Sequence, residues 1–307
     1  MKRFGVSTHL YHEERLQKAH LLEIAANGFD AVEVFATRSH FDYHDAAAIR
    51  ELQSWLGEAG LDLHSVHAPI TDVFANGRGQ RTFSTAARDN DARKATLNEI
   101  FSALNIAKTI PFSFLIVHLG VPVAWTPGAD DNHRESAIRS IADIQATAEA
   151  VGVKVALEVM GNSLSTAPDL VEILEQSFEG TDLGICMDVG HAHLLGDAAD
   201  AIETASEYLV TTHIHDNRGQ HDDHLVPFQG TINWPAAVMA FEKIGYDGVL
   251  MYEVRAAENP HSVLERAASA RKRLEAMMMD SFMADMADLK VGTTSNTTST
   301  KNTTTEE

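Results

Sequence analysis

The segment MDVGHAHLLGD, residues 187–197, ends a short apolar run with an aspartate and then places a glycine and a histidine after it. If the run is a β-strand, Asp188 stands at its carboxyl end, Gly190 allows a sharp turn, and His191 follows three residues after the carboxylate. A carboxylate and an imidazole in this spacing can share one pocket. The same spacing fits a second interpretation, in which Asp188 caps the next helix and His191 is a loop residue.

Seven other apolar runs along the chain resemble this one, and the eight lie at residues 4–9, 31–35, 61–67, 114–118, 153–159, 183–188, 210–215 and 249–253. Between them, apolar residues such as Leu170, Ile173 and Leu174 recur at helical spacing, and glycines such as Gly28 and Gly60 provide stops. This alternation predicts the α/β class and a single (β/α)8 TIM barrel over residues 1–280. An open, doubly wound sheet would give the same local signal.

Polar side chains at the strand ends favour the closed barrel over the open sheet. One stands at or near the C-terminal end of each predicted strand: His9, Glu33, His67, His118, Glu158, Asp188, His213 and Glu253. In a closed barrel these ends converge on one mouth, whereas in an open sheet most of them would lie too far apart to meet.

The segment THIHDNRGQHDDHLVPFQGTINW, residues 212–234, is the densest in polar chemistry. Strand alternation points His213 and His215 to one side, and Asp222 and His224 follow on a loop. Four histidines and three aspartates fall within residues 213–224. A solvated polar loop is the alternative interpretation, but loops without a ligand rarely accumulate imidazoles.

Glu158 in ALEVM and Glu253 in MYEVR each lie within an apolar strand. A buried glutamate needs a cation, a metal or a hydrogen-bonding neighbour, and a structural ion pair with Arg255 is one alternative. Together with Asp188 and His213 the two glutamates form a mixed oxygen and nitrogen set suited to Mn²⁺, Mg²⁺ or Zn²⁺.

Composition narrows the classes of partner and compartment. The 307 residues carry a formal charge of −20, which repels polyphosphates and disfavours nucleic acid as a partner. One cysteine, Cys186, excludes an intramolecular disulfide and fits a reducing cytoplasm. The N-terminus has no long apolar region typical of a secretory signal, and no stretch is long and apolar enough for a membrane span. We expect a cytoplasmic protein that acts on a small molecule.

Two regions fall outside the strand–helix pattern. Residues 71–93 form a long polar loop after the third strand, a candidate lid or wall of the pocket, and residues 121–132 form another loop at the mouth. Residues 281–307 are predicted to be a C-terminal extension, mostly a disordered tail rich in Thr, Ser and Asn from residue 291 onward.

The sequence resembles the xylose isomerase-like TIM-barrel superfamily, which includes sugar phosphate isomerases and epimerases and endonuclease IV-like enzymes. The resemblance covers nearly the whole chain before the tail and rests on the motifs HAP, VHLG, LEV, MDVGH, HIHDN, DDHLVPFQGTINW and YEV. One departure is Gln229 in FQG, where the superfamily often has glutamate in a Gly-Glu-Gly turn. Any role of that carboxylate is therefore in doubt.

The sugar-epimerase branch implies a divalent metal held by Glu158, Asp188, His213 and Glu253. The two glutamates would also form the catalytic proton-transfer pair, and substrate contacts would come from His191, Arg218 and His67. The endonuclease IV-like branch implies a larger set with room for two or three zinc ions, and its additional ligands would be His67, His118, His191, Asp222 and His224.

Three functions follow as hypotheses. The first is metal-dependent isomerisation or epimerisation of a sugar or related hydroxy-carbonyl through an enediolate. The second is a zinc phosphodiesterase that acts on abasic DNA, and the third is a non-catalytic barrel that binds a sugar or metal. The sequence does not distinguish isomerase, epimerase and lyase chemistry. It also leaves open the substrate, the identity and number of the metal ions, and whether the chain forms a homo-oligomer.

Overall fold

The computed structural model describes residues 2–75, 78–79, 81–255 and 259–294. Eight parallel strands close into a barrel in the order β1-β10-β9-β8-β7-β6-β3-β2, which confirms the predicted single-domain (β/α)8 fold. The barrel strands are β1 Phe4–Ser7, β2 Ala31–Phe35, β3 Asp62–His67, β6 Phe114–Val117, β7 Lys154–Glu158, β8 Gly184–Asp188, β9 Leu209–Ile214 and β10 Leu250–Tyr252.

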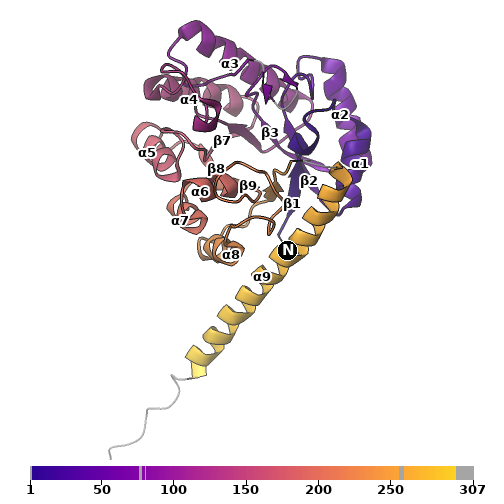
Figure 1. Cartoon of the computed structure of the whole chain (residues 1–307), viewed down its shortest axis with the longest axis vertical. Helices are drawn as coiled ribbons and strands as arrows, with labels where there is room; N and C mark the ends of the chain where they lie inside the picture. The colour runs from indigo at the N-terminus through magenta and orange to yellow at the C-terminus, as the bar shows by residue number, and fades with distance from the viewer. Residues whose placement is uncertain (1, 76–77, 80, 256–258, 295–307) are drawn as a thin grey trace, which may run out of the picture.

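Helices surround the strands, as Figure 1 shows. The α-helices are α1 Lys18–Ala26, α2 Ala46–Ala59, α3 Asn90–Leu104, α4 Arg134–Glu149, α5 Ala167–Ser177, α6 Val189–Leu195, α7 Ala198–Thr204, α8 Trp234–Lys243 and α9 Pro260–Thr294. Three short 3₁₀ helices are η1 Thr8–Tyr11, η2 Asn105–Lys108 and η3 Val123–Trp125. Within the described part of the chain, every helix is too short or too polar to cross a bilayer.

The strands are buried on both faces, because the helices cover one face and the barrel interior fills the other. Ile116, Ala156 and Cys186, on three adjacent strands, form a small apolar cluster separate from the main core between strands and helices. Since side chains alternate along a strand, Glu158 and Asp188 point to the same side as Ala156 and Cys186. The barrel therefore carries the predicted carboxylates directly above an apolar layer.

Helix punctuation follows the sequence signals. Gly28 and Gly60 have φ angles of 84° and 68°, the left-handed region in which glycine is favoured, and they follow the ends of α1 and α2. The first strand differs from expectation, because β1 ends at Ser7 and His9 lies in η1. The reason is local: the Ser7 hydroxyl accepts a hydrogen bond from the His9 amide at 3.3 Å and so starts a 3₁₀ turn.

The two irregular regions gain some structure. The loop at 71–93 contains a two-stranded antiparallel hairpin, β4 Phe74–Ala75 and β5 Arg78–Gly79, before α3 begins. Helix α9 continues to Thr294 and extends past the barrel in Figure 1, so residues 281–294 are helical, including the first four residues of the expected tail. Residues 295–307 lie outside the described residues, and their disorder stays a prediction.

Candidate metal centre

A cavity of about 770 Å³ opens at the C-terminal ends of the strands. Most of the predicted polar strand ends face it, together with both irregular loops. Its lining includes His9, Phe35, His67, Gly79, Thr82, His118, Trp125, Thr126, Glu158, His191, Asp222, His224, Glu253 and Arg255. The loop at 71–93 thus forms a wall of the pocket, as its position in the sequence predicted, and the loop at 121–132 contributes to the lining as well.

The four residues expected to bind the metal converge beside this cavity, and two of them, Glu158 and Glu253, line it. Glu158, Asp188, His213 and Glu253 each offer one donor atom, and the four atoms lie within 4.8 Å of one another. From His213 Nδ1, the distances are 3.4 Å to Glu158 Oε1, 3.6 Å to Glu253 Oε2 and 3.9 Å to Asp188 Oδ2. Two donors bound to one ion at about 2.0–2.2 Å lie about 3.0–3.5 Å apart, so a small contraction would enclose a cation.

Two buried atoms in this cluster have no hydrogen-bond partner: Glu158 Oε1 and His213 Nδ1. Buried polar atoms are normally satisfied, and an unmet pair aimed at one point is what a metal ion would complete. The residues present therefore fit a divalent cation.

Glu33 explains why His213 presents Nδ1 to the cluster. Its buried carboxylate lies 3.0 Å from His213 Nε2 and accepts hydrogen bonds from the hydroxyls of Ser7 (2.9 Å) and Ser65 (2.7 Å). Nε2 must be the donor in this contact, which leaves the Nδ1 lone pair free for a metal. Glu33 stands near a predicted strand end, but no local pattern assigns it a role, because its partner lies 180 residues away in the chain.

Three further imidazoles are held in one tautomer by main-chain carbonyls. The Nδ1 atom of His67 lies 2.9 Å from the carbonyl oxygen of Ala68. In the same way, His191 Nδ1 lies 3.0 Å from Val159 O, and His224 Nδ1 lies 2.8 Å from Glu253 O. A carbonyl oxygen can only accept, so each Nδ1 carries the proton, and Nε2 of the neutral ring is a lone pair.

Each of these Nε2 atoms faces a carboxylate. His67 Nε2 lies 3.2 Å from Glu158 Oε2, while His191 and His224 Nε2 lie 3.1 and 3.0 Å from Asp222 Oδ2. A lone pair facing a carboxylate oxygen is unfavourable unless a proton or a cation lies between them. This geometry gives the imidazoles the orientation of metal ligands.

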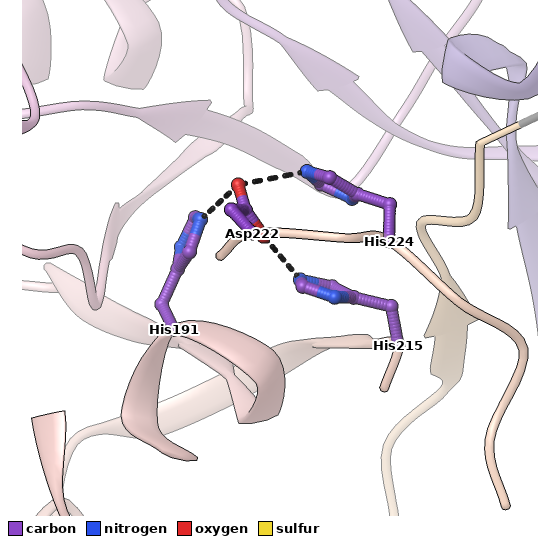
Figure 2. Close-up of side chains that lie close together, drawn as sticks. All are labelled: His191, His215, Asp222 and His224. Atoms are coloured by element: carbon purple, nitrogen blue, oxygen red, sulfur yellow. Dashed lines mark hydrogen bonds and ion pairs between the residues drawn. The ribbon is translucent and has the colours of Figure 1, made fainter. Parts of the chain in front are cut away.

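The carboxylates thus divide the polar side chains into three neighbouring groups. The first group is the four-residue cluster, and the second consists of His67, His118 and Glu158, which belongs to both. His118 Nε2 lies 3.0 Å from Glu158 Oε2. The third group is His191, His215, Asp222 and His224. Figure 2 shows its three imidazoles directed at Asp222 from different parts of the barrel mouth.

His215 connects the third group to the first, since its Nε2 lies 3.0 Å from Asp188 Oδ1 and 3.8 Å from Asp222 Oδ1. Strand alternation placed His215 beside His213, but the predicted ligand sets omitted it. The alternating HIH pattern was the available signal.

The electrostatics reflect this density of carboxylates. Burial acts to raise the pKa of Glu158, but His118 and His213 outweigh it and hold that pKa well below its ordinary value. Burial dominates at Glu253 and raises its pKa. Burial acts to lower the pKa of His224, yet Asp222 raises it to about 9. Without a cation the site is balanced by protonated imidazoles, so metal binding must release protons.

Asp188 combines the two interpretations that the sequence left open. Its Oδ1 accepts a hydrogen bond from the His191 amide at 2.7 Å and caps α6, while the same carboxylate belongs to the four-residue cluster. Gly190 serves a different purpose from the expected turn: it lies inside α6, and a Cβ there would be 2.0 Å from His215 Cε1. Close approach of an imidazole, not backbone freedom, requires glycine.

Two residues singled out in the sequence lie away from the cavity. The Arg218 side chain is 63% exposed and pairs with Asp223 at 3.5 Å, and it is not part of the cavity lining. The structure therefore does not bring Arg218 to the predicted substrate site. Gln229 is also exposed and outside the lining.

Comparison with known proteins agrees with this architecture. A model of the family described as xylose isomerase-like TIM barrel matches residues 21–278. The D-psicose 3-epimerase of Ruminiclostridium cellulolyticum is 24% identical over 244 residues, 77% of this chain and 77% of its own length. The solved structure of a D-tagatose 3-epimerase-like protein is 26% identical and superimposes with a TM-score of 0.74, covering 92% of this chain and 100% of that one.

A further solved structure, an IOLI protein with a binding zinc atom, is 19% identical with a TM-score of 0.69 and covers 91% of this chain and 99% of that one. At that identity it shows the shared fold. The fold, the strand-end chemistry and the family match agree: the chain belongs to the xylose isomerase-like TIM-barrel family.

Proposed function

We propose that this protein is a metal-dependent isomerase or epimerase of a sugar or a related hydroxy-carbonyl compound. The observation that carries the proposal is the convergence of Glu158, Asp188, His213 and Glu253, with two of their buried donor atoms unsatisfied. Relatives named as a psicose epimerase and an inosose isomerase support the substrate class.

The four side chains would hold the cation. Their three carboxylates and one imidazole suit Zn²⁺ or Mn²⁺ better than Mg²⁺, which prefers oxygen ligands only. When bound, the cation polarises the substrate carbonyl and an adjacent hydroxyl, so that the hydrogen on the neighbouring carbon becomes acidic. His67 and His191 line the same cavity and can contact substrate oxygens.

Glu158 and Glu253 are the proposed proton-transfer pair. Both carboxylates line the cavity that would receive the substrate, and both offer a donor atom to the four-residue cluster. Glu158 as carboxylate takes the proton from the carbon next to the carbonyl, leaving an enediolate. A proton returned through Glu253 to the opposite face or to the neighbouring carbon would give the epimer or the isomer, and exchange with solvent would restore the starting protonation of the pair.

The test uses glutamine variants that keep side-chain size. Purified protein is loaded with Mn²⁺ or Zn²⁺ and incubated in D₂O with psicose, tagatose, fructose and inosose, and deuterium at carbon is measured by mass spectrometry. We expect Glu158→Gln and Glu253→Gln to lose about 10²–10⁴-fold of the exchange rate while keeping the fold. Glu175→Gln, at an exposed position of α5, is the matched control. Exchange that persists in both cavity variants would refute the mechanism.

A second candidate is a zinc phosphodiesterase acting on abasic DNA, and the two additional groups around Glu158 and Asp222 favour it. The net charge of −20 opposes a polyanionic substrate. Arg255 is the one Lys or Arg among the described residues that line the cavity, and it pairs with Glu13 at 3.6 Å. Nicking of an abasic-site duplex by zinc-loaded protein at low salt, without any exchange on sugars, would favour this alternative.

A further inference from the structure

We propose that Asp216 is a positioning residue that fixes the loop between β9 and α8 and thereby holds Asp222 and His224 in the cavity. Asp216 lies just after β9 and its side chain is fully buried. It belongs to none of the three groups of candidate metal ligands.

Four N–H groups donate to its carboxylate. Oδ1 accepts from the amides of Asn217 (2.9 Å) and Ile232 (3.2 Å). Oδ2 accepts from the Phe228 amide and from Trp234 Nε1, both at 2.9 Å. Three of these donors lie 12 to 18 residues further along the chain, so one carboxylate joins the beginning of the loop to its end.

The main chain of Asp216 closes the part of the loop that reaches the cavity. Its amide donates to Leu225 O at 2.7 Å and its carbonyl accepts from the Leu225 amide at 2.8 Å. Asp222 and His224 lie between these two residues in sequence, and Figure 2 shows the Asp222 carboxylate between the imidazoles of His191 and His224. The loop segment 216–225 is therefore held by Asp216 at one end and by its pairing partner at the other.

This loop conformation needs such support because two of its residues are strained. His224 and Phe228 have φ angles of 48° and 74°, which side chains larger than glycine rarely adopt. The carboxylate of Asp216 holds the amide of Phe228, and the guanidinium of Arg273 on α9 covers its ring at 3.7 Å.

Gly230 of the FQG motif explains how the contact is made. A Cβ at this position would lie 2.3 Å from Asp216 Oδ1 and 2.2 Å from Asn217 O. The glycine allows the loop to cross the carboxylate closely, so the motif belongs to the positioning contact and not to the cavity.

Asp216→Asn tests the inference with a nearly isosteric change. Whichever way the new amide turns, two of the four N–H groups face another donor, so the loop loses half of its anchor. The β-barrel supplies His67 and His213 from β3 and β9, and their contacts with Ala68 O and Glu33 do not involve the loop. We therefore expect His191 and His224 to respond while His67 and His213 do not.

The readout is the histidine side-chain ¹H–¹⁵N correlation spectrum of the full-length protein as purified. Signals are assigned by their loss in His67→Gln, His191→Gln, His213→Gln and His224→Gln variants. In Asp216→Asn we expect the His191 and His224 signals to shift, and the His67 and His213 signals to keep their positions. The matched control is Asp223→Asn on the same loop, since the hydrogen bond and the ion pair of the Asp223 carboxylate both go to Arg218, and the change should shift neither pair.

Unchanged His191 and His224 signals in Asp216→Asn would overturn the proposal, as would equal shifts in all four histidines, which indicate a general loosening. If Asp216→Asn does not fold, Trp234→Phe decides, because it removes a single donor from the same carboxylate. It should shift the same two signals by a smaller amount, and no shift there would overturn the proposal. The spectrum does not depend on turnover, so its outcome is separate from that of the proposed isomerase activity.

Discussion

Replacing Glu33 by glutamine should weaken metal binding although all four proposed metal ligands stay in place. Glu33 is fully buried and accepts hydrogen bonds from Ser7, Ser65 and His213. Burial acts to raise its pKa, but His213 outweighs that effect and the pKa lies below its ordinary value. The carboxylate is therefore ionised and orients the imidazole, with Nε2 as donor and Nδ1 directed at the cation.

The expected magnitude follows from that contact. A buried charge-assisted hydrogen bond contributes about 1.5–3 kcal/mol, and removing a residue that orients a ligand typically weakens metal affinity about 10–100-fold. A 10–100-fold loss corresponds to about 1.4–2.7 kcal/mol, so the two estimates agree. Water cannot replace the contact, because His213 and Glu33 are both inaccessible to solvent.

The assay is a competition titration of Zn²⁺ between the protein and a chelating dye, run beside thermal unfolding with and without Zn²⁺. At saturating metal, the hundredfold loss would reduce the stabilisation by Zn²⁺ by about 2.7 kcal/mol. Ser65→Ala is the control, since it removes one hydrogen bond to Glu33 and leaves the contact between Glu33 and His213 in place. Wild-type affinity in Glu33→Gln would refute the reasoning.

Three further predictions concern stability and the limits of the site. Burial lowers the pKa of His64 to about 4, whereas the same side chain in the unfolded state titrates near 6.5. Between pH 6.5 and pH 4 the unfolded state therefore binds more protons than the folded state, and the free energy of unfolding falls as the pH drops through this range. The loss from this group reaches about 3 kcal/mol at pH 4, and denaturant unfolding of His64→Asn should show a correspondingly weaker pH dependence. Gly190→Ala should lower stability by about 1–3 kcal/mol because its Cβ would meet His215, whereas Gly57→Ala, with open space around it, should not destabilise α2; thermal melts compare the two. Arg218→Ala should change the unfolding free energy by less than about 0.5 kcal/mol and leave Zn²⁺ affinity unchanged in the dye titration, and a large loss of either would return Arg218 to the site.

Arg218 and Glu33 illustrate what local sequence patterns leave undetermined. Both carry charge near a predicted strand end, but Arg218 lies on a loop and Glu33 lies within β2. The direction of the loop side chain and the partner of the strand side chain depend on tertiary contacts that no local pattern records. Arg218 turns outward to Asp223, while Glu33 turns inward to His213. The C-terminal helix is a second example: tail composition did not predict that α9 would continue to Thr294.

The amino-acid sequence by itself determined the barrel and most of its mouth. Periodic apolar runs indicate strands covered by helices. In a closed barrel the C-terminal ends of all strands converge on one mouth, so a polar residue at each of these ends faces the same opening. It also indicated which residues would meet there, because Glu158, Asp188, His213 and Glu253 stand at or near the C-terminal ends of their strands.

Only the tertiary structure decided how those residues face one another. Hydrogen bonds to main-chain carbonyls fix the tautomers of the histidines, and Glu33 orients His213 so that its Nδ1 lone pair faces the cluster. The Asp216 carboxylate accepts hydrogen bonds from the loop that carries Asp222 and His224. These are contacts between groups far apart in the chain. Their geometry depends on the closure of the barrel, and a linear pattern contains no information on the ångström scale at which hydrogen bonds and metal ligation are selected.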